Sequence, residues 1–470
     1  MNDVSGFLEA IGDVPAIVDA LTVKRRGRDL SGKFSPILKR DAQDKVADLV
    51  VSPRNRDDLF RIASAAARTK MPLIARGGGS ANFGQNIPLR GGAILDTTAL
   101  DKLLWVRDAV VRAEAGIKVS LLDEKTRTEG WELRIHPSTK KMATIGGFIG
   151  GGHAGIGSCT YGILRDRGNI RGLQVMSVEE TPRIVELRGE AVNLVHHAYG
   201  ANGIITEVEM PLAPAWAWRE AIVTFPDFMA AVEFSYALAV SDGILKKLIS
   251  IVGWPLPSMI TRLVPFVPDG TTPVLVMIGE QNFEIFEELV KGFGGTITAQ
   301  SLEGQGAYHG PIWEYAWGHT RMHINNIDPS LVSAIGLYIG SDSVAAIRRS
   351  YNRFKDVGAM HLEVKRFDGK LSFQGSPLFP FVDEAHMAWV MQGMAEDGAM
   401  VANNHTFLVK QGGMKSVTAD DVRFKREMDP YDLCNPGKLS FMLEEPEPQQ
   451  DGSGAALPSS GWSYDIPKAS

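Results

Sequence analysis

The run RGGGSANFGQ, residues 76–85, constrains the fold of this chain more than any other segment. It follows MPLIA (71–75), an apolar segment that predicts a buried strand, and a second apolar strand, AILDT (93–97), comes soon after. The three consecutive glycines lack Cβ atoms, so their backbone can turn tightly and bring N–H groups close to a ligand. We predict a phosphate or pyrophosphate nest, and not a Walker loop, because no Lys-Ser or Lys-Thr pair follows. The residues assigned to this nest are Arg76, Gly77, Gly78, Gly79, Ser80, Asn82 and Gln85.

A second glycine-rich segment, MATIGGFIGGGHAGIGSCTYG (142–162), contains eight glycines. Its residues Gly150, Gly152 and Gly155 match the GxGxxG fingerprint of Rossmann dinucleotide-binding units. A Rossmann unit also needs a strand directly before the glycines and an acidic residue at the end of the next strand. Here the polar loop HPSTKKM (136–142) precedes them, and no βαβ unit of the right length surrounds them. We therefore reject a Rossmann fold.

Together, the two glycine loops resemble the flavin domain of the vanillyl-alcohol oxidase/p-cresol methylhydroxylase (PCMH) superfamily of FAD enzymes. Residues 50–80 are similar to the opening strand, helix, strand and pyrophosphate loop of that family. TIGGFIGGG (144–152) resembles its second FAD loop, and YGANGIITEVEMPLAP (199–214) the strand that closes the flavin domain. DPYDLCNPGKL (429–439) resembles its C-terminal return. The middle of the chain is similar to the cap domains of the FAD-linked oxidase group.

The resemblance implies an α+β fold with a two-lobed, PCMH-type FAD-binding domain and an α+β cap over an antiparallel sheet. We expect an N-terminal lead-in (1–45), the FAD-binding domain (46–214), the cap (215–415) and a return to the flavin domain (416–445). Residues 446–470 are rich in Pro, Gly, Ser and Gln, which predicts a disordered tail or one draped over a neighbouring subunit. A homodimer is thus compatible with the sequence.

Apolar periodicity predicts the main elements of these domains. Helices are expected over residues 57–70, 120–130, 226–240, 283–292, 343–357 and 383–398, and strands over TPVLVMIGE (272–280) and HLEVKRF (361–367). The basic run KRRGR (24–28) is interpreted as a solvated arm rather than a nucleic-acid contact, because the whole chain is acidic.

Composition favours a cytoplasmic enzyme that acts on a small molecule. A net charge of −6 and a pI near 6.0 argue against a nucleic-acid or anionic-membrane partner. Two cysteines, Cys159 and Cys434, argue against a disulfide framework and suit a reducing compartment. No apolar leader or long apolar run is present, so we expect no membrane segment.

The resemblance implies FAD as the cofactor and assigns residues to its parts. The second glycine loop should follow the diphosphate and ribityl chain, where side chains would collide. Ile204 and Ile205 should present backbone groups to the adenine end, and Asn435 and Lys438 should lie near the isoalloxazine edge. The second-loop residues in this set are Thr144, Gly146, Gly147, Gly150, Gly151 and His153.

Two departures from flavinylated relatives predict non-covalent FAD. Those relatives commonly carry a His after the first glycine loop, where this chain has Ser80. Bicovalent relatives carry a Cys just before the second loop, where this chain has Met142. Neither side chain supplies the required nucleophile, and Cys159 is out of register.

The cap should supply the base that a hydride transfer from a C–OH or C–NH carbon requires. It holds HGPIWEYAWGHTRMH (309–323) and, further on, His361, Arg366 and His405. We predict His319 as the base, with His405 as an alternative and Arg366 as the stabiliser of a deprotonated phenol. The opposing interpretation is that several of these histidines are structural and that Trp313, Tyr315 and Trp317 are core residues rather than a substrate pocket.

A metal site is not expected. His319 and His323 are four residues apart, so on a helix they would share one face, as zinc ligands do. No Glu follows His319, so the zincin motif is missing. The His-containing, Gly-Asp-Gly-rich segment of metal-binding flavin relatives is also missing.

Three functions compete at this point. The first is an FAD-dependent oxidoreductase that takes a hydride from a small alcohol, hydroxy acid or phenol, with reoxidation by oxygen or another acceptor. The second is a redox-neutral FAD enzyme that works through a substrate–flavin adduct. The third is a flavoprotein that binds FAD without catalysis.

Overall fold

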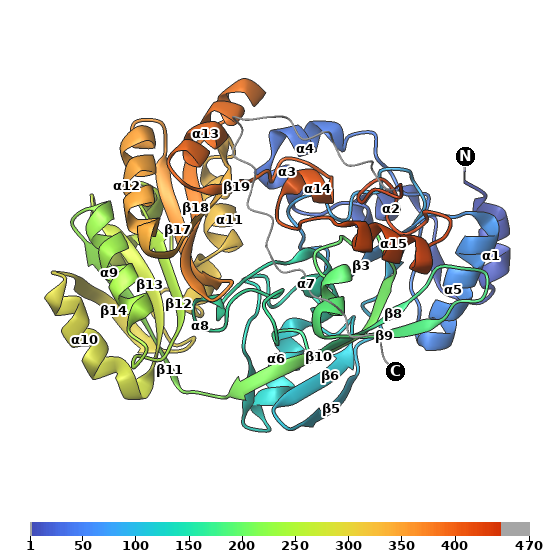
Figure 1. Ribbon diagram of the computed structural model, residues 1–470, viewed down its shortest axis with the longest axis horizontal. Helices are drawn as coiled ribbons and strands as arrows, with labels where there is room; N and C mark the ends of the chain where they lie inside the picture. The colour runs from blue at the N-terminus through green and yellow to red at the C-terminus, as the bar shows by residue number, and fades with distance from the viewer. Residues whose placement is uncertain (1, 443–470) are drawn as a thin grey trace.

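The computed structural model describes residues 2–442 and shows two lobes that lie side by side (Figure 1). One lobe contains most of the first 214 residues and the C-terminal return, and it is called the flavin lobe after the resemblance described above; the other contains the cap (Figure 1). The predicted tail, 446–470, lies outside the described residues. Within residues 2–442, no helix has the length and apolarity needed to cross a bilayer.

The first sheet of the flavin lobe carries the first glycine loop. Its order is β1-β2-β4-β3, with β2, β4 and β3 parallel and β1 antiparallel at the edge. Helix α5 connects β2 to β3, and its apolar residues Leu59, Ile62 and Ala66 are buried at the predicted helical spacing. Asn55 caps the first turn of α5 by accepting from the Asp58 N–H at 2.9 Å. The elements are α1 (Val4–Ile11), β1 (Ala16–Ile17), β2 (Leu49–Val51), α5 (Arg56–Thr69), β3 (Leu73–Arg76) and β4 (Ala93–Asp96).

The second sheet of this lobe carries the second glycine segment. Its order is β5-β6-β10-β8-β9, and β7 pairs with the far end of β10. All of its pairings are antiparallel. The elements are β5 (Leu103–Arg107), β6 (Val110–Glu114), α6 (Val119–Arg127), β7 (Trp131–Leu133), α7 (Ile145–Gly151), α8 (Ser158–Tyr161), β8 (Gly172–Met176), β9 (Ile184–Arg188) and β10 (Ile204–Pro214).

The cap is a nine-stranded antiparallel sheet in the order β14-β11-β13-β12-β17-β18-β16-β19, with β15 paired to β18. This confirms the predicted α+β architecture. The strands are β11 (Trp218–Phe225), β12 (Lys246–Val252), β13 (Thr272–Gly279), β14 (Thr296–Leu302), β15 (Leu331–Ser333), β16 (Ile335–Ile339), β17 (Ala359–Phe367), β18 (Lys370–Pro380) and β19 (Met400–Ala402).

Alternating residues of the cap strands face two different layers. One face packs on helices α9, α10, α12 and α13, which line the outer side of the molecule (Figure 1). The opposite face packs on the segment 308–324, which includes most of α11. The helices are α9 (Phe228–Val240), α10 (Phe283–Gly292), α11 (Gly318–Ile327), α12 (Ser343–Phe354) and α13 (Glu384–Glu396).

The C-terminal return closes the flavin lobe from behind β3. Leu73 N–H donates to Leu433 at 2.8 Å, and Asn435 N–H donates back to Leu73 at 2.8 Å. The return therefore extends the edge of the first sheet. Its helices are α14 (Val409–Gly412) and α15 (Ala419–Met428), and Thr418 and Asp421 form a capping box at the start of α15.

The lead-in is folded and bridges the two lobes. Its helices are α2 (Ala20–Arg26), α3 (Ser31–Phe34) and α4 (Pro36–Asp41). The solvated-arm interpretation of residues 24–28 is wrong for two of its side chains. Arg26 pairs with Asp96 at 2.9 Å, and Arg28 donates to the Lys45 carbonyl at 2.5 Å. Helix α2, which ends at Arg26, packs against β2, and this places both guanidiniums near their partners.

One buried ion pair fastens the cap to the flavin lobe. Lys247 on β12 donates to Glu132 on β7 at 2.6 Å, and both side chains are fully buried. Trp218 Nε1 and Arg127 donate to the same carboxylate at 3.0 and 2.8 Å. Because four side chains from both lobes meet here, the pair fixes the position of one lobe on the other.

We predict that Glu132→Gln lowers the free energy of unfolding by about 3 kcal/mol, because it leaves the buried Lys247 ammonium without its nearest counter-charge. Urea denaturation followed by tryptophan fluorescence measures this. Glu280→Gln removes a half-exposed partner of Arg219 and serves as the control, with an expected loss below about 1 kcal/mol. Equal losses for the two variants would contradict the role given to the buried pair.

Candidate active site between the two lobes

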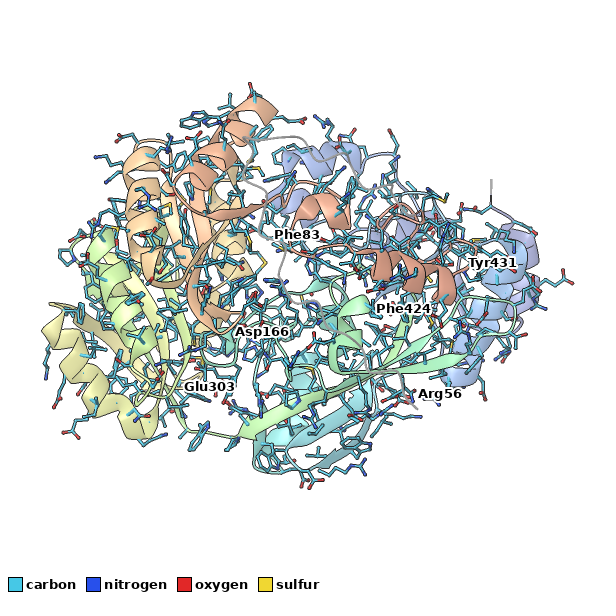
Figure 2. All side chains as sticks on the ribbon, viewed as in Figure 1. Arg56, Phe83, Asp166, Glu303, Phe424 and Tyr431 are labelled. Atoms are coloured by element: carbon cyan, nitrogen blue, oxygen red, sulfur yellow. The ribbon has the colours of Figure 1, made fainter. Side chains whose placement is uncertain are left out.

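A cavity of about 290 Å³ lies between the lobes. Both glycine segments form one side of it, and α11, β17 and β18 of the cap form the other. Figure 2 places Phe83, from the first glycine loop, where the lobes meet. The predicted cofactor residues that line the cavity are Arg76, Gly77, Gly78, Gly79, Ser80, Asn82, Gln85, Thr144, Gly146, Gly147, Gly150, Gly151, His153 and Ile205.

The two glycine segments touch each other at distances that only glycine allows. A Cβ on Gly78 would lie 1.8 Å from the Met142 carbonyl oxygen, and one on Gly77 would lie 1.9 Å from Thr144 Oγ1. The first loop is therefore glycine-rich because the second segment packs directly against it. Gly79 has a φ of +67°, which side-chain-bearing residues rarely adopt.

Part of the second glycine segment forms a short helix, α7, where a loop was expected. Thr144 caps it by accepting from the Gly147 N–H at 3.2 Å. Its glycines divide between two faces. A Cβ on Gly146 would lie 2.6 Å from Ala115 Cβ, so this face packs on the lobe. A Cβ on Gly150 or Gly151 would meet no atom closer than 3.8 or 3.6 Å, so this face leaves room in the cavity.

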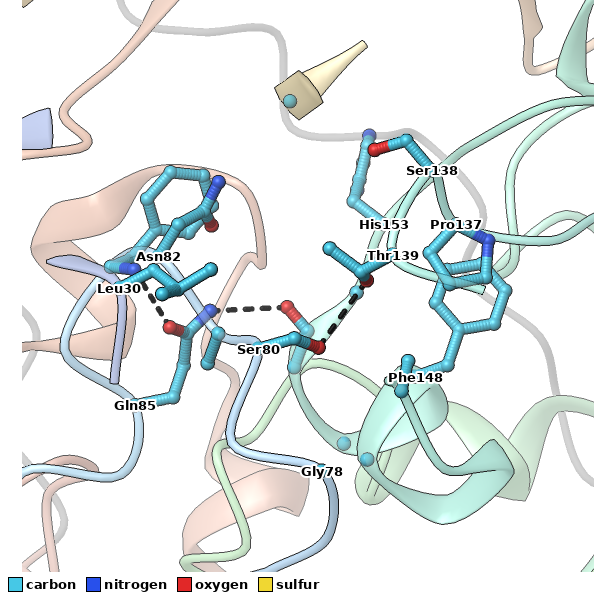
Figure 3. A pocket seen from close by; sticks show the side chains of 18 of the residues that line it. Leu30, Gly78, Ser80, Asn82, Gln85, Pro137, Ser138, Thr139, Phe148 and His153 are labelled. Carbon is cyan, nitrogen blue, oxygen red and sulfur yellow. Dashed lines mark hydrogen bonds between the residues drawn. The ribbon is translucent and has the colours of Figure 1, made fainter. Parts of the chain in front are cut away.

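Side-chain hydrogen bonds hold the two segments in register (Figure 3). Gln85 accepts from the Phe83 N–H at 2.8 Å and donates to the Gly151 carbonyl at 3.2 Å. Ser80 Oγ lies 3.3 Å from Thr139 Oγ1. The amide of Gln85 thus joins the first loop to the end of α7.

Asn435 and Lys438 support the first loop from behind and do not line the cavity. Asn435 Nδ2 donates to the Gln85 and Tyr199 carbonyls at 2.8 and 2.7 Å. Lys438 Nζ donates to the Gly84 carbonyl at 2.6 Å, and burial lowers the pKa of this ammonium to about 7. Ile204 is buried behind its neighbour Ile205, which does line the cavity.

Two polar side chains on the flavin side keep unused hydrogen-bonding atoms. Arg76 Nη1 donates to the Gly77 carbonyl at 3.1 Å, whereas its Nε has no hydrogen-bond partner among residues 2–442. Burial lowers the pKa of the Arg76 guanidinium from its ordinary value. His153 Nδ1 is also without a partner, and burial holds the pKa of this ring well below its ordinary value. The neutral imidazole and the guanidinium are both free to meet a ligand.

On the cap side, two histidines line the cavity and each has a carboxylate neighbour. His319, on α11, places Nδ1 3.0 Å from a Glu314 oxygen. His361, on β17, places Nε2 2.9 Å from Glu363 Oε1. The structure thus brings the predicted base His319 to the cavity and adds His361, to which the sequence assigned no role. The alternation in HLEVKRF could have indicated that His361 and Glu363 share one face of a strand.

The other two catalytic candidates lie outside the cavity. His405 Nδ1 contacts Ser35 Oγ at 2.8 Å and its Nε2 contacts the Ser333 carbonyl at 3.0 Å, so both ring nitrogens are engaged. Burial lowers the pKa of His405 to about 4. Arg366 points to Asp242 on the protein surface at 3.4 Å. The geometry favours structural roles for both.

The remaining cap residues divide between core and cavity. Trp313 and Tyr315 belong to the buried core beneath the sheet, and Trp317 reaches the cavity wall. His323 stacks on Tyr315 and contacts the Glu314 carbonyl at 3.2 Å, so it does not act with His319 on one ion. In the part of the chain that the structure describes, no three His, Cys, Asp or Glu side chains converge as a metal site.

Arg321 is the least expected residue of the site. It lies on α11, lines the cavity and packs its guanidinium 4.9 Å from the Phe34 ring centroid. Nη2 donates to the Phe34 carbonyl at 3.0 Å, Nε has no partner, and no described carboxylate pairs with the guanidinium. Burial lowers its pKa to about 10, which still leaves it charged at neutral pH. Sequence reasoning missed it because a single Arg on a helix carries no pattern.

The site fits an extended nucleotide cofactor. Gly150 and Gly151 leave a cradle that any side chain would fill, and the free Nε of Arg76 supplies positive charge beside the glycine nest. A diphosphate needs such backbone proximity and charge, and the apolar lining can take a flat ring system. The cavity also extends past the glycine segments to the cap sheet, where a second molecule can bind.

Comparison with known proteins agrees with this geometry. The FAD binding domain family matches residues 47–185. A glycolate oxidase subunit of Bacillus subtilis is 27% identical over 213 residues, which cover 43% of this chain and 44% of the relative. D-lactate dehydrogenase of Archaeoglobus fulgidus is 27% identical over 176 residues, which cover 35% of this chain and 39% of the relative. The alignments therefore span less than half the length of these curated relatives.

Solved structures share the fold over nearly the whole chain. Alkyldihydroxyacetonephosphate synthase superposes with a TM-score of 0.65 at 18% identity, covering 93% of this chain and 86% of that one. A BBE-like 1 variant of Physcomitrella patens superposes with a TM-score of 0.65 at 12% identity, covering 94% and 100%.

We predict that Gly151→Val keeps the fold but weakens FAD binding about 10–100-fold, because the new side chain enters the cradle and overpacking costs about 1–3 kcal/mol. Flavin absorbance per purified chain and FAD titration measure this. Gly292→Val, at the exposed end of α10 where a Cβ meets no atom, is the matched control. A Gly151→Val protein that retains a full flavin complement would show that α7 does not contact the cofactor.

Proposed function

We propose that this chain, which belongs to the vanillyl-alcohol oxidase/p-cresol methylhydroxylase superfamily of FAD-linked oxidases, oxidises a small hydroxy acid with FAD. The observation that carries the proposal is the continuous cavity from the glycine segments to a polar cap face that contains Arg321, with which no carboxylate of residues 2–442 pairs. When bound, FAD supplies the two-electron acceptor. The side chains of the cavity must bind the substrate and accept its hydroxyl proton.

Arg321 favours a carboxylate-bearing substrate over a neutral alcohol or a phenol. A guanidinium enclosed by protein is costly unless an anion pairs with it, and none of the described carboxylates does so. Its fork of N–H donors matches a carboxylate. Stacking on Phe34 holds the guanidinium plane in place before the substrate arrives. A hydroxy acid bound here would place its carboxylate at α11 and its C–OH carbon further into the cavity.

The hydroxyl proton needs an acceptor, and the cavity offers two imidazoles. His319, the candidate from the sequence, and His361 both line it with a carboxylate close by. An imidazole accepts a proton at the ring nitrogen that carries a lone pair, so either ring can take the hydroxyl proton as the C–H bond breaks.

The experiment that tests the function is anaerobic reduction of the bound flavin. Glycolate and D-lactate, offered in turn, should bleach the oxidised flavin band, whereas 1-propanol and vanillyl alcohol should not. Bleaching by the neutral alcohols alone would contradict the hydroxy-acid proposal. Product formation without net flavin reduction would indicate the redox-neutral adduct chemistry, and no change with any compound would favour a binding protein.

We predict that Arg321→Met raises KM for the hydroxy acid about 30-fold or more, because one partner of a desolvated charge pair is lost. Flavin content should stay unchanged. Arg348→Met, which removes an exposed arginine of α12 paired with Glu233, serves as the control and should leave KM as it is. An unchanged KM in Arg321→Met would show that the guanidinium does not bind the substrate.

We also propose that FAD is held without a covalent bond. Ser80 and Met142 occupy the positions where flavinylated relatives carry a nucleophile, and Ser80 Oγ instead contacts Thr139. Acid precipitation should release all yellow colour into the supernatant. Flavin fluorescence that stays with the polypeptide on a denaturing gel would contradict this prediction.

A cytoplasmic location fits the proposal, because both cysteines are buried and free and an oxidising compartment would offer them no partner. Cell fractionation tests it, and recovery of the protein outside the cytoplasm would overturn it.

A further inference from the structure

His361 and Glu363 stand on the same face of β17, a central strand of the cap sheet between β12 and β18. Both line the cavity, and both side chains are buried, with 8% and 4% of their area exposed. A central strand is among the most rigid parts of a sheet, so these two groups hold their positions better than side chains on a loop.

The contacts of Glu363 decide which nitrogen of His361 carries the proton. Glu363 Oε1 accepts from Ser250 Oγ at 2.8 Å and from the backbone N–H of Trp317. His361 Nε2 approaches the same oxygen at 2.9 Å. A carboxylate only accepts, so Nε2 must be the protonated nitrogen. Nδ1 then keeps its lone pair, and no described residue donates to it.

His319 lacks this arrangement although it also has a glutamate beside it. Its Nδ1 lies 3.0 Å from a Glu314 oxygen, within ion-pair distance, but the contact does not meet hydrogen-bond geometry. Glu314 is also paired with Lys141 at 2.6 Å and is 20% exposed. Its charge is therefore already compensated, whereas Glu363 has no basic partner other than His361 among the described residues.

We propose, building on the function proposed above, that His361 is the proton acceptor of the oxidation and that Glu363 is its positioning residue. The substrate O–H bond breaks, and the proton moves to His361 Nδ1. The electron pair left on oxygen forms the carbonyl, while the hydrogen of the same carbon leaves as hydride to the oxidant, FAD. Protonated His361 then carries a positive charge 2.9 Å from the Glu363 carboxylate, which stabilises it.

Other charged or titratable groups line the same cavity and set the background for this proton transfer. Glu363 stands beside His361 on β17. Helix α11 contributes His319 and Arg321, and the flavin lobe contributes Arg76, His153 and Tyr199. Lys365, the next residue on this face of β17, is turned to Gln374 Oε1 at 2.6 Å, and burial lowers its pKa to about 7.

The test compares two matched variants, His361→Gln and His319→Gln, by anaerobic stopped-flow reduction with D-lactate or glycolate. We expect His361→Gln to bind FAD normally but to reduce it about 10²–10⁴-fold more slowly. It should also lose the rise of the rate with pH that deprotonation of the imidazole gives to the wild type, whereas His319→Gln should keep that rise. A pH rise that disappears in His319→Gln and persists in His361→Gln would overturn the proposal.

Glu363→Gln separates positioning from packing. It keeps an oxygen that can accept from Nε2 but removes the charge, so we expect the reduction rate to fall about 10–100-fold with an unchanged flavin complement. Glu314→Gln is the matched control for loss of a neighbouring carboxylate. A rate in Glu363→Gln equal to that of the wild type would overturn the positioning role.

A readout independent of turnover keeps this proposal distinct from the proposed function. In ¹⁵N-histidine-labelled, flavin-loaded protein, the His361 signals, identified by their loss in His361→Gln, should show a protonated Nε2 and an unprotonated Nδ1. A protonated Nδ1 would overturn the assignment of His361 as the proton acceptor, even if hydroxy acids reduce the flavin. If the expected tautomer is present but no hydroxy acid reduces the flavin, the substrate proposal is refuted, while the arrangement of His361 and Glu363 remains supported.

Discussion

The close approach of two glycine segments is the contact on which the rest of the site depends. Residues 77 and 78 lie so near the backbone and side chains of residues 142–144 that a Cβ on either would overlap an oxygen. The approach fixes the distance between the two sheets of the flavin lobe, because the first loop leaves β3 and the second segment packs under β10. A side chain at Gly78 would push the sheets apart and would act on the fold before it acted on any ligand.

This contact shapes the cavity because α7 turns its second glycine face away from the contact. Gly146 packs on Ala115, while Gly150 and Gly151 leave open space on the other side. The return segment holds the first loop from behind through Asn435 and Lys438. The cap then closes the remaining side, held by the buried pair of Glu132 and Lys247. In the proposed function, the backbone of the glycine segments therefore binds the cofactor, and side chains of the cap bind the substrate and accept its proton.

Local patterns in the sequence predicted the elements that bury one continuous face. The helix expected over 283–292 is α10 with the same bounds, and the strand in 361–367 is the core of β17. The glycine run 144–152 was expected to be a loop, but its cap, Thr144, and its close packing on the lobe make residues 145–151 helical. Glycine's poor helix propensity is overridden here by tertiary contacts.

The chemistry of the cap was predicted only in part, because it depends on which side chains the sheet brings together. His319 reaches the cavity, but His405 and Arg366 are used by Ser35, Ser333 and Asp242. The residues next to His405 and Arg366 in the sequence do not indicate that these partners will be close in space. The pairing of His361 with Glu363 could have been predicted, because residues two apart on a strand share a face. That no carboxylate of residues 2–442 pairs with Arg321 follows only from the three-dimensional positions of these groups.

A crystal structure of the purified yellow protein would show whether FAD lies between the glycine segments and the cap. We predict FAD density with the diphosphate between Gly77–Gly79 and α7, near Arg76, and with the isoalloxazine ring in the cavity facing β17 and β18 of the cap. Diphosphate density away from both glycine segments, or a ring that points away from the cap sheet, would contradict this prediction.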